Sequence, residues 1–282
     1  MWVMLNSYYE NADKYLKYSH LVMKQACDMG FHMDDRFEIY FFISGYASYF
    51  IEKSVYQLKY GDLFVVNSNE IHKASYQSGD SYERIIIMFD PSIGRIFGSE
   101  KLDLLGCFMN RPKGEQNKIS LCKTQVEELM RYFSRLDALS MEQSDHAKLL
   151  RLTCFIELLA FINKVFKQTE PVTDTSVLSD KLQPVLDYID SNLGGDLSLR
   201  HLGNRFFISS YYLGSLFKRH TGMNIHEYIV MKRISKAKIY LSEGYNITEV
   251  CQMSGFGDYS HFIRSFKNLV GASPGRYRKN FR

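Results

Sequence analysis

The stretch GFGDYSHFIRSFKNLVG at residues 255–271 repeats, in outline, the stretch FFISSYYLGSLFKRHTG at residues 206–222. Each copy has a residue that can cap a helix, then apolar residues at helical spacing, then a glycine at which a helix can end. Each copy therefore predicts one short helix. The equivalent positions, 49 residues apart, are Ser209 and Asp258, Leu213 and Phe262, Phe217-Lys218 and Phe266-Lys267, and Gly222 and Gly271.

A shorter apolar-faced helix is predicted before each copy, with Asn246 able to cap the second one. Two helices joined by a tight turn, the second with a polar outer face, describe a helix-turn-helix. Two such units are therefore predicted, at about 199–220 and 247–270. The apolar faces of the shorter helices consist of Leu199, Leu202 and Phe206 in the first unit, and Ile247, Val250 and Met253 in the second.

The segment Ile225–Ser242 between the units contains no glycine or proline, and it predicts one long helix. A rigid helix would fix the separation of the two units, so that both could enter successive major-groove faces of one DNA duplex about 34 Å apart. The apolar residues expected to pack both units are Ile229, Ile234, Ala237, Ile239 and Leu241, and the basic residues expected to face outward are Lys232, Arg233, Lys236 and Lys238.

The second helix of each unit supplies the candidate contacts to base edges, on the face opposite its apolar stripe. These candidates are Ser210, Tyr211, Gly214 and Ser215 in unit one, and Tyr259, Ser260, His261 and Arg264 in unit two. Arg264 can contact a guanine through two hydrogen bonds, so unit two is predicted to contribute more hydrogen-bond specificity. The candidate phosphate contacts are Lys218, Arg219, Lys267, Arg276, Arg278 and Lys279.

Charge is distributed unevenly along the 282 residues. Residues 176–282 carry 15 Lys and Arg against 8 Asp and Glu, whereas residues 1–175 carry 20 against 23. A basic domain attached to a slightly acidic one is typical of nucleic-acid-binding proteins. The chain is 45% hydrophobic, which excludes disorder throughout, and it has no membrane-spanning stretch or signal peptide, so we expect a soluble cytoplasmic protein. The five cysteines form no CxxC pair, so no zinc site is predicted.

The region from about Phe37 to Phe89 has short runs of aromatic and β-branched residues separated by turn residues. With no helical crossover between them, these runs predict an antiparallel sheet, closed or stacked into a small barrel. The expected strands are 37–44, 47–52, 62–66 and 84–89.

Helical spacing begins at about Leu121, and two helices are predicted before a linker at Thr169–Asp180. The second helix has an apolar stripe that includes Asn163. Two interpretations remain open: the stripe pairs two protomers with one polar residue fixing the register, or the helix packs on its own barrel. The other stripe residues are Leu149, Leu152, Ile156, Leu159 and Phe166.

The segment Pro184–Tyr277 resembles the DNA-binding domain of AraC/XylS-type transcriptional regulators. The small alanine usual in the first helix of each unit is replaced by Gly203 and by Cys251, which are also small. The resemblance implies a ligand-responsive, dimeric regulator, often of carbohydrate uptake or metabolism. The motifs that carry it are Ser209-x3-Leu213, Phe217-Lys218-x3-Gly222, Arg233-x3-Ala237, Gly255-Phe256-x5-Phe262-x3-Phe266-Lys267 and Gly271-x-Ser273-Pro274-x2-Tyr277-Arg278.

The strand region resembles, more loosely, the cupin effector domain that such regulators often carry. Metal-binding cupins pair His-x-His-x3-Glu-x6-Gly with a later His, and here the first motif reads His32-x-Asp34-x3-Glu38-x6-Gly45, followed by His72. An Asp can replace a His as a ligand, but the second motif departs, and the regulator family has generally lost the metal. The resemblance therefore implies no metal and no other cofactor. It places His32, Glu38, His72 and Tyr76 near a barrel mouth that binds a small polar effector, while His32 and Glu38 could instead be exposed at strand starts.

The sequence as a whole predicts an α+β multidomain protein. Its parts are a cupin-like β-barrel at 1–120, a helical dimerisation segment at 121–168, a linker at 169–180 and an all-α DNA-binding domain at 181–282. The predicted function is a sequence-specific transcription activator that is not an enzyme. Its expected partners are promoter DNA, a small-molecule effector such as a sugar, a second copy and RNA polymerase, with no membrane. Two alternatives remain: a metal-dependent cupin enzyme with an appended DNA-binding domain, and a constitutive regulator without a ligand.

Overall fold

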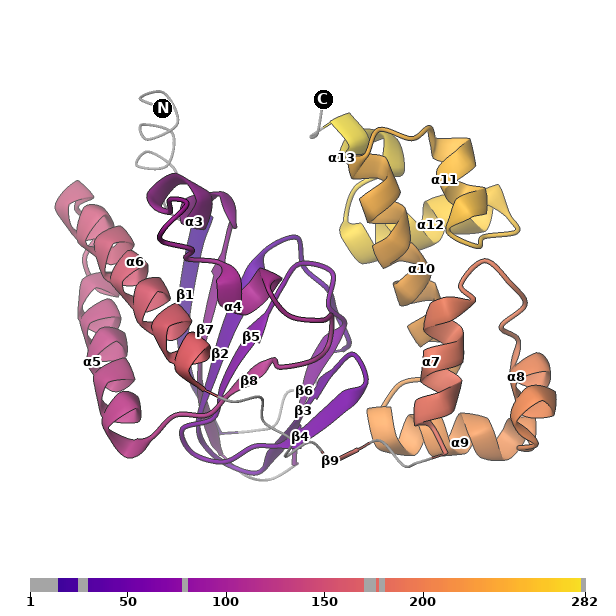
Figure 1. Cartoon of the computed structure of the whole chain (residues 1–282), viewed down its shortest axis with the longest axis horizontal. Coiled ribbons are helices and arrows are strands. Elements are labelled where there is room, and N and C mark those ends of the chain that lie inside the picture. The colour runs from indigo at the N-terminus through magenta and orange to yellow at the C-terminus, as the bar shows by residue number, and fades with distance from the viewer. Residues whose placement is uncertain (1–14, 25–29, 78–80, 170–175, 178–180, 280–282) are drawn as a thin grey trace.

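The computed structural model describes residues 15–24, 30–77, 81–169, 176–177 and 181–279. Figure 1 shows a sheet-rich N-terminal part with helices on its outer side, and an all-helical C-terminal part beside it. The predicted fold class, an antiparallel sheet domain with following helices and then an all-α domain, is confirmed. Cys27 lies outside the described residues.

Two antiparallel sheets form the N-terminal part. The first has strand order β1-β7-β2-β5-β8 and the second has β6-β3-β4-β9. The strands are β1 (Leu16–Met23), β2 (Phe37–Ser44), β3 (Ala47–Ile51), β4 (Ser54–Gln57), β5 (Leu63–Val66), β6 (His72–Tyr76), β7 (Tyr82–Phe89), β8 (Lys118–Ile119) and β9 (Ser176–Val177).

Of the two expected arrangements, closed or stacked, the structure has two stacked sheets and no closed barrel among the described strands. A barrel requires each strand to be hydrogen-bonded to the next all the way round. Among the described strands no ladder joins the two sheets, and β1, β8, β6 and β9 are left as sheet edges. The sheets are instead held together by side chains packed between them, such as Tyr40, Tyr49 and Phe64.

Strand β2 is buried on both faces because it lies between the second sheet and the helices. Its side chains alternate, so Phe37 and Phe41 pack toward the helices and Tyr40 and Phe42 pack toward the second sheet. The run FEIYFFIS, apolar at nearly every position, suits such a doubly covered strand. Glu38 shares the inner face with Tyr40, and this periodicity places a carboxylate between the two sheets.

Helices α5 (Lys123–Ser140) and α6 (Asp145–Gln168) cover the outer face of the first sheet (Figure 1). Phe133 of α5 packs on Phe41, and Phe155 of α6 packs on Phe89, with ring centroids 5.2 and 4.9 Å apart. The short helices α3 (Ser92–Phe97) and α4 (Gly106–Met109) complete this layer. In the part of the chain that the structure describes, no helix is long and apolar enough to cross a membrane.

Asn163 of α6 is buried inside its own protomer. Its Nδ2 donates to the carbonyl oxygens of Leu104 and Leu159, at 2.6 and 2.9 Å, and its Oδ1 accepts from the Cys107 amide at 2.9 Å. For this residue the structure shows the second interpretation, a helix packed on its own domain, and not a polar position in a dimer seam. Dimerisation through segment 121–168 stays a prediction.

The expected linker contributes a strand to the N-terminal domain. Strand β9 pairs with β4, with Val177 opposite Ser54 and Ser176 opposite Val55. A two-residue strand without apolar periodicity leaves no pattern in the sequence, which is why we expected only a loop here.

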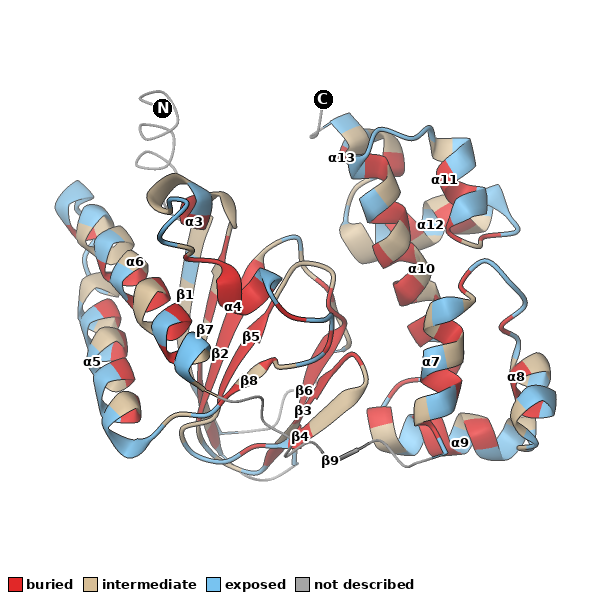
Figure 2. Ribbon diagram, viewed as in Figure 1, coloured by how far each residue is buried: buried red, intermediate tan, exposed pale blue. Residues whose placement is uncertain are grey.

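The C-terminal part has a core built around its longest helix, α10. Leu213, Phe217, Phe262 and Phe266 from the two helix-turn-helix units are fully buried in it, as Figure 2 shows by colour for these helices. Met33, Phe50 and Ile71 of the N-terminal domain belong to the same apolar cluster, so the two domains share a packed interface. The helices are α7 (Gln183–Ser191), α8 (Leu199–Phe206), α9 (Ser210–Thr221), α10 (Ile225–Ser242), α11 (Ile247–Met253), α12 (Tyr259–Val270) and α13 (Pro274–Lys279).

Candidate DNA-binding surface and ligand cluster

Side-chain oxygens cap the first and second helix of both units. Ser198, Ser209, Asn246 and Asp258 each accept a hydrogen bond from the amide three residues further along, which satisfies one of the free donors at a helix start. The caps predicted at Ser209, Asn246 and Asp258 are therefore confirmed. Helices α9 and α12 end at Gly222 and Gly271, with φ of 80° and 76° in the left-handed region.

The turns of the two units are tight for different reasons. In unit one the left-handed turn residue is Phe207, with φ 54°, and a Cβ on Gly203 would lie 2.6 Å from the Ile208 carbonyl oxygen. Glycine at 203 therefore lets α8 approach the turn more closely than the usual alanine could. In unit two the left-handed residue is Gly255, with φ 91°, and a Cβ there would lie 2.0 Å from the Leu193 carbonyl oxygen.

Helix α10 connects the units as expected, but its basic residues do not all face outward. Lys232 and Lys238 are 7% and 2% exposed and lie against the N-terminal domain. Lys232 Nζ is 2.7 Å from Glu52 and 2.8 Å from Asp190, and Lys238 Nζ is 2.6 Å from Asp35. The prediction for these two lysines was wrong, because carboxylates distant in sequence neutralise a face that looks solvent-exposed in the helix alone.

Two further residues of α10 differ from expectation. Arg233 is half-buried and bonds to backbone carbonyls, with Nε donating to Leu193 and Nη2 donating to Gly195, both at 2.9 Å. Ile239, expected to pack both units, is 46% exposed. Helix α10 therefore packs against both units and against the N-terminal domain. A division of its residues into one buried face and one exposed face does not describe it.

Most candidate base contacts lie on exposed parts of α9 and α12. Tyr211 is 88% exposed and Tyr259 is 47% exposed, and Ser215, Ser260 and Arg264 are also exposed. Gly214 is half-buried next to Leu199. Two candidates are turned toward the protein: Ser210 Oγ donates to the Leu199 carbonyl at 3.1 Å, and the His261 ring stacks on His226 at 6.4 Å between centroids.

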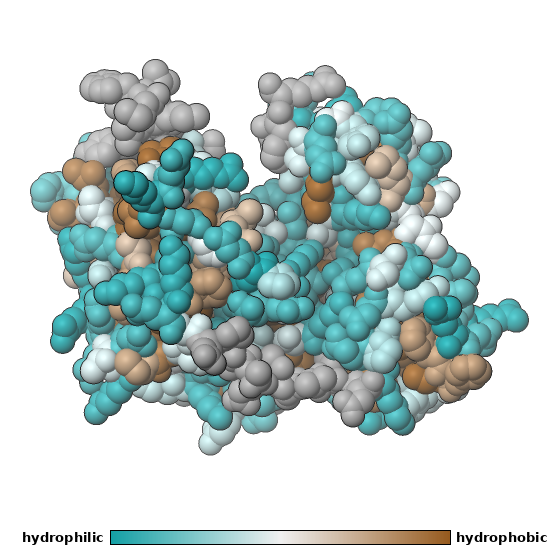
Figure 3. Space-filling view, viewed as in Figure 1, coloured by the Kyte–Doolittle hydropathy of each residue, from teal (hydrophilic) through white to brown (hydrophobic). Residues whose placement is uncertain are grey.

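The candidate phosphate contacts cluster at helix ends. Lys218 and Arg219 lie in the last turn of α9 and Lys267 in the last turn of α12, and all three are exposed. In α13, Arg276 and Lys279 are exposed, whereas Arg278 Nη1 donates to the Tyr245 carbonyl at 3.2 Å. Figure 3 shows a largely hydrophilic surface, with a hydrophobic area at the lower right over α8 and α9. Phe207, between these two helices in the sequence, is 97% exposed.

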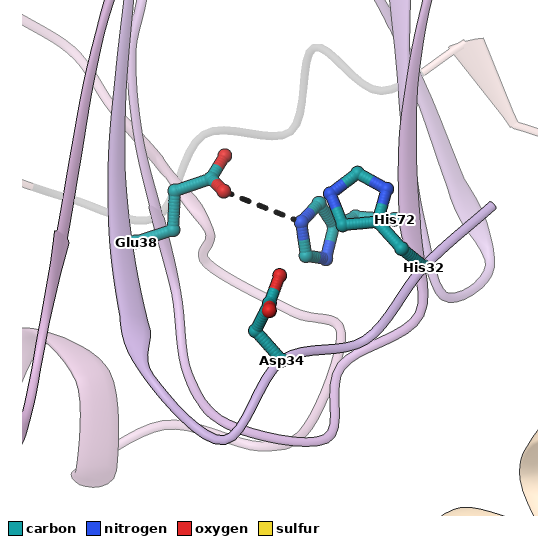
Figure 4. Close-up of side chains that lie close together, drawn as sticks. All are labelled: His32, Asp34, Glu38 and His72. Carbon is teal, nitrogen blue, oxygen red and sulfur yellow. Dashed lines mark ion pairs between the residues drawn. The ribbon is translucent and has the colours of Figure 1, made fainter. Parts of the chain in front are cut away.

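Three of the four candidate effector residues meet, with Asp34, in one cluster (Figure 4). One possible ligand atom from each of His32, Asp34, Glu38 and His72 lies within 4.8 Å of the others. Glu38 comes from β2 and His72 from β6, so the two facing sheets bring them together. His32 joins through an isolated bridge with His72, in which each amide donates to the other's carbonyl, at 3.2 and 3.1 Å. Glu38 is 5% exposed, so it is not an exposed residue at a strand start.

The cluster contains a buried ion pair. His72 Nε2 lies 3.5 Å from Glu38 Oε2, and Tyr49 OH donates to Glu38 Oε1 at 2.9 Å. Burial alone would raise the pKa of Glu38, but the charge and hydrogen bond of His72, the charge of His32 and the hydrogen bond from Tyr49 together outweigh burial and lower that pKa to about 2. For His72, burial lowers the pKa, but the charge and hydrogen bond of Glu38, the hydrogen bond to the Glu70 backbone and the charge of Asp34 together outweigh burial and give a pKa of about 9. Burial and the neighbouring His72 lower the pKa of His32.

Tyr76 lies apart from this cluster, in a second polar group between the sheets. Its hydroxyl is 2.9 Å from the Tyr40 hydroxyl and accepts from Arg84 Nη1 at 2.7 Å. The Tyr76 and Tyr82 rings stack at 3.7 Å, and the Arg84 guanidinium lies 5.3 Å from the Tyr76 ring centroid. Hydroxyls, a guanidinium and stacked rings are groups that can hydrogen-bond and stack on a polar organic ligand.

The ionic contacts between the domains were not predicted from the sequence. Glu52 is 1% exposed and lies 3.2 Å from Lys113 and 2.7 Å from Lys232. Burial would raise the pKa of Glu52, but the two ammonium groups together lower it below the ordinary value. Lys53 pairs with Asp187 and Asp190 at 2.7 and 2.9 Å. Glu52 and Lys232 are 180 residues apart, so no local pattern could have predicted their pairing.

Comparison with known families follows the same division of the chain. A model of the AraC-like ligand binding domain matches residues 22–159, and a model of the helix-turn-helix domain matches residues 202–280. The fold and the two matches define a transcription regulator with a ligand-binding domain and a DNA-binding domain. The chain belongs to the AraC-type transcriptional regulators, as its motifs predicted.

Individual relatives are more distant. The chain is similar to the Msm operon regulatory protein of Streptococcus mutans serotype c (25% identity over 263 residues, 90% of each chain). It is also similar to an uncharacterized HTH-type transcriptional regulator of Staphylococcus aureus strain COL (24% identity over 240 residues, 84% of this chain). The match spans 31% of the length of that relative.

One solved structure is similar to about a third of the chain, and another is similar to most of it. A Listeria innocua protein of unknown function is 37% identical over 36% of this chain and 97% of that chain, with a TM-score of 0.35. ToxT of Vibrio cholerae bound to an unsaturated fatty acid is 13% identical over 94% of this chain and 95% of that chain, with a TM-score of 0.39.

Proposed function

We propose that this chain is a ligand-controlled, sequence-specific activator of transcription that acts as a dimer in the cytoplasm and does not catalyse a reaction. The observation that supports this most directly is the placement of two helix-turn-helix units on one continuous helix. The outer faces of α9 and α12 remain exposed while α10 is attached to the ligand-binding domain. A ligand that alters this attachment can therefore alter DNA binding, provided that it binds the two arrangements with different affinity.

The two units have different chemistry for contacting DNA. Unit two presents Arg264, whose guanidinium can donate two hydrogen bonds to the O6 and N7 atoms of a guanine. Unit one presents Tyr211 and Phe207, which suit apolar contact with thymine methyl groups and the sugar-phosphate backbone. We therefore expect discrimination by hydrogen bonds mainly in the half-site of unit two.

The test is selection of binding sequences by the full chain, followed by affinity measurements on the selected site and on single-base variants of it. Arg264→Ala should lose about 1–3 kcal/mol of discrimination at one base pair. Lys267→Ala should weaken binding to all sequences alike and lower the salt slope by about one.

Arg135→Ala is the matched control, because Arg135 is an exposed arginine of α5 that pairs with Glu157 at 2.9 Å, far from the proposed surface. Its affinity and its salt slope should equal those of the unaltered protein. If Arg264→Ala keeps full affinity and full discrimination, the role of Arg264 is wrong.

The proposed effector is a small polar molecule such as a sugar, bound between the sheets near Tyr40, Tyr76 and Arg84. A panel of sugars is added to the full chain and the melting temperature is measured. A sugar that binds should raise this temperature. Tyr76→Phe should reduce the rise, because it removes the hydroxyl that lies 2.9 Å from the Tyr40 hydroxyl and accepts from Arg84 Nη1 at 2.7 Å. The absence of a shift with every ligand would favour a regulator without small-molecule control.

Activation and dimerisation need separate measurements. Sedimentation of the full chain, with and without DNA, reports whether two copies associate. A reporter gene placed behind the selected site distinguishes activation, which would involve RNA polymerase, from repression.

A further inference from the structure

We propose that Arg233 fixes the spacing between the two half-sites that one copy of the chain recognises, because it holds the segment that leads into unit one against the turn of unit two. This inference rests on the proposed function, since it concerns how both units bind one DNA duplex. Arg233 is a positioning residue: it acts through the two units, and no contact between Arg233 and DNA is part of its role.

Helix α10 passes between the two units. Figure 1 shows α7, α8 and α9 near one end of this helix and α11, α12 and α13 near the other. The 18 residues of α10 span about 27 Å at a rise of about 1.5 Å per residue, and this length sets the overall distance between the units. The helix alone does not determine how each unit is tilted on it, so contacts along its side decide the remaining geometry.

Arg233 lies at the middle of α10 and makes two hydrogen bonds to one segment. Its Nε donates to the Leu193 carbonyl and its Nη2 donates to the Gly195 carbonyl, both at 2.9 Å. The guanidinium is planar and its donors have a fixed arrangement, so the two bonds determine the orientation of the segment as well as its distance. A lysine ammonium at this position would act as a point charge and would not impose the same orientation.

The segment after α7 that accepts these bonds is itself tightly turned. The Gly195 amide donates to the Asn192 carbonyl at 2.9 Å, and the Ser198 amide donates to Asp196 Oδ1 at 2.8 Å. Leu193 is 8% exposed and belongs to the apolar cluster around α10. Because Ser198 caps α8, a shift of this segment moves the first helix of unit one.

The Leu193 carbonyl also touches unit two. A Cβ on Gly255 would lie 2.0 Å from this carbonyl oxygen and 2.9 Å from Arg233 Nε, so the backbone of the unit-two turn lies directly against both groups. The turn is closed by the Gly255 amide, which donates to the Gln252 carbonyl at 3.0 Å. Helix α10, the segment leading into unit one and the turn of unit two therefore meet at Leu193.

Next to this contact the space between the units is open. A cleft of about 560 Å³ is lined by residues 194–198, by His226, Ile229 and Arg233 of α10, and by residues 252 and 255–257 of unit two. Side chains do not fill this cleft, so little packing there opposes a movement of one unit relative to the other. We therefore expect the two bonds of Arg233 to limit such a movement.

The two units bind DNA as linked modules, so the geometry of the link determines the affinity. After one unit has bound, the other binds with an effective concentration that depends on how well the link matches the separation of the half-sites. One inserted base pair moves the half-sites apart by about 3.4 Å and rotates them by about 34°. A rigid link favours a single spacing, whereas a loosened link binds several spacings with similar affinity and the best one less tightly.

The experiment measures the affinity of the full chain for its selected site and for duplexes with one base pair inserted or removed between the half-sites of units one and two. In the unaltered protein, either change should weaken binding by at least about twentyfold. In Arg233→Lys the same changes should weaken binding by less than about fivefold, because the loosened link adapts to the spacing. Arg233→Met, which also removes the charge, should show the same reduced dependence on spacing.

Lys236→Met is the matched control for the loss of a charge on α10. Lys236 lies three residues further along the helix, and its Nζ is 5.7 Å from the Tyr240 ring centroid. Binding by this variant should depend on the spacing as strongly as binding by the unaltered protein.

A duplex that carries only the half-site of unit two distinguishes positioning from a loss of folding. Arg233→Lys should bind this duplex with an affinity within about twofold of that of the unaltered protein, because one unit alone does not use the link. Circular dichroism measures the helix content of each variant. A loss of half-site affinity in both Arg233→Lys and Arg233→Met would overturn the proposal, because the residue would then support the fold of unit two and not its position.

A dependence on spacing that is as steep in Arg233→Lys and Arg233→Met as in the unaltered protein would also overturn the role of Arg233, and it would leave the proposed function intact. If the unaltered protein binds no DNA sequence specifically, the proposed function itself is contradicted, and this inference with it.

Discussion

Gly255 and Gly257 occupy the same turn of the second helix-turn-helix unit but have different surroundings. Gly255 has a left-handed backbone, and any Cβ there would collide with the Leu193 carbonyl oxygen at 2.0 Å and crowd Arg233 Nε at 2.9 Å. Gly257 has no heavy atom within 4 Å of the position of a Cβ. The first glycine is therefore required by the packing of α11 on the segment after α7, whereas the second is not.

Gly255→Ala should destabilise the protein by about 1–3 kcal/mol, because a β-carbon adds both backbone strain and a collision with a carbonyl. Equilibrium unfolding in urea measures the change. Gly257→Ala is the control in the same turn, and it should change the free energy of unfolding by less than about 0.5 kcal/mol. Equal effects of the two substitutions would contradict this account of the turn.

The elements differ in how far the sequence predicted them. The second helix of each DNA-binding unit could be predicted because a cap, an apolar stripe and a terminal glycine coincide in it. Strand β2 could be predicted from its aromatic run. Strand β6, with sequence HKASY, could not, because it contains neither β-branched residues nor a run of aromatic residues, and its pairing with β3 decides its structure.

The candidate sites were predicted to the same uneven extent. His32, Glu38 and His72 were named from the motif spacing, and the inner face of β2 brings Glu38 to the histidines. Tyr76 was predicted to belong with them, but it lies four residues further along β6 than His72, and its hydroxyl is hydrogen-bonded to the Tyr40 hydroxyl. A sequence motif does not show that two residues on the same face of a strand belong to different polar clusters. Which cluster each residue joins depends on the side chains that the facing sheet places opposite it.

At the scale of elements, His20 connects β1 to both β7 and α5 through its two carboxylate partners. Burial lowers the pKa of His20, but the hydrogen bonds and charges of Asp137 and Glu83 outweigh this and raise it above the ordinary value of 6.5. Because the pKa is higher in the folded state, this contribution to stability is fully present below about pH 6.5 and is lost as the pH rises through the folded-state pKa.

Urea unfolding at about pH 6 and about pH 9 tests this contribution. His20→Gln should lower the free energy of unfolding more at the lower pH than at the higher one. His226→Gln removes an exposed histidine of α10 and should show the same change at both values. A His20→Gln effect that does not vary with pH would mean that the imidazole is not charged in its contacts.

At the scale of the whole molecule, the two domains are joined by charge pairs in which at least one member is buried. Lys238 is 2% exposed, and burial lowers its pKa despite the adjacent Asp35, which is itself half exposed. Lys232 and Glu52 form a second such contact. Replacement of one member of such a pair lowers the stability of the protein, because the other member is left as an unpaired buried charge.

Asp35→Ala should therefore lower the free energy of unfolding by about 1–2 kcal/mol, a value reduced by the partial exposure of Asp35. It should also increase the rate of proteolysis between the two domains. Glu157→Ala, which breaks the exposed pair with Arg135 on α5 and α6, is the control and should have an effect below about 0.5 kcal/mol. Unchanged stability and unchanged proteolysis in Asp35→Ala would show that this contact does not hold the domains together.

The pairing of β9 with β4 also limits the distance that the DNA-binding domain can travel. While Ser176 and Val177 stay on the sheet edge, only residues 178–182 separate the N-terminal domain from α7. If that short strand detaches, the tether extends back to the end of α6 at Gln168 and gains nine residues, or roughly 30 Å of reach. This is close to the rise of one turn of B-form DNA, about 34 Å. In the proposed dimer, release of these two paired residues together with the packed interface between the domains would thus let each copy reach operators whose half-sites differ in spacing by one helical turn.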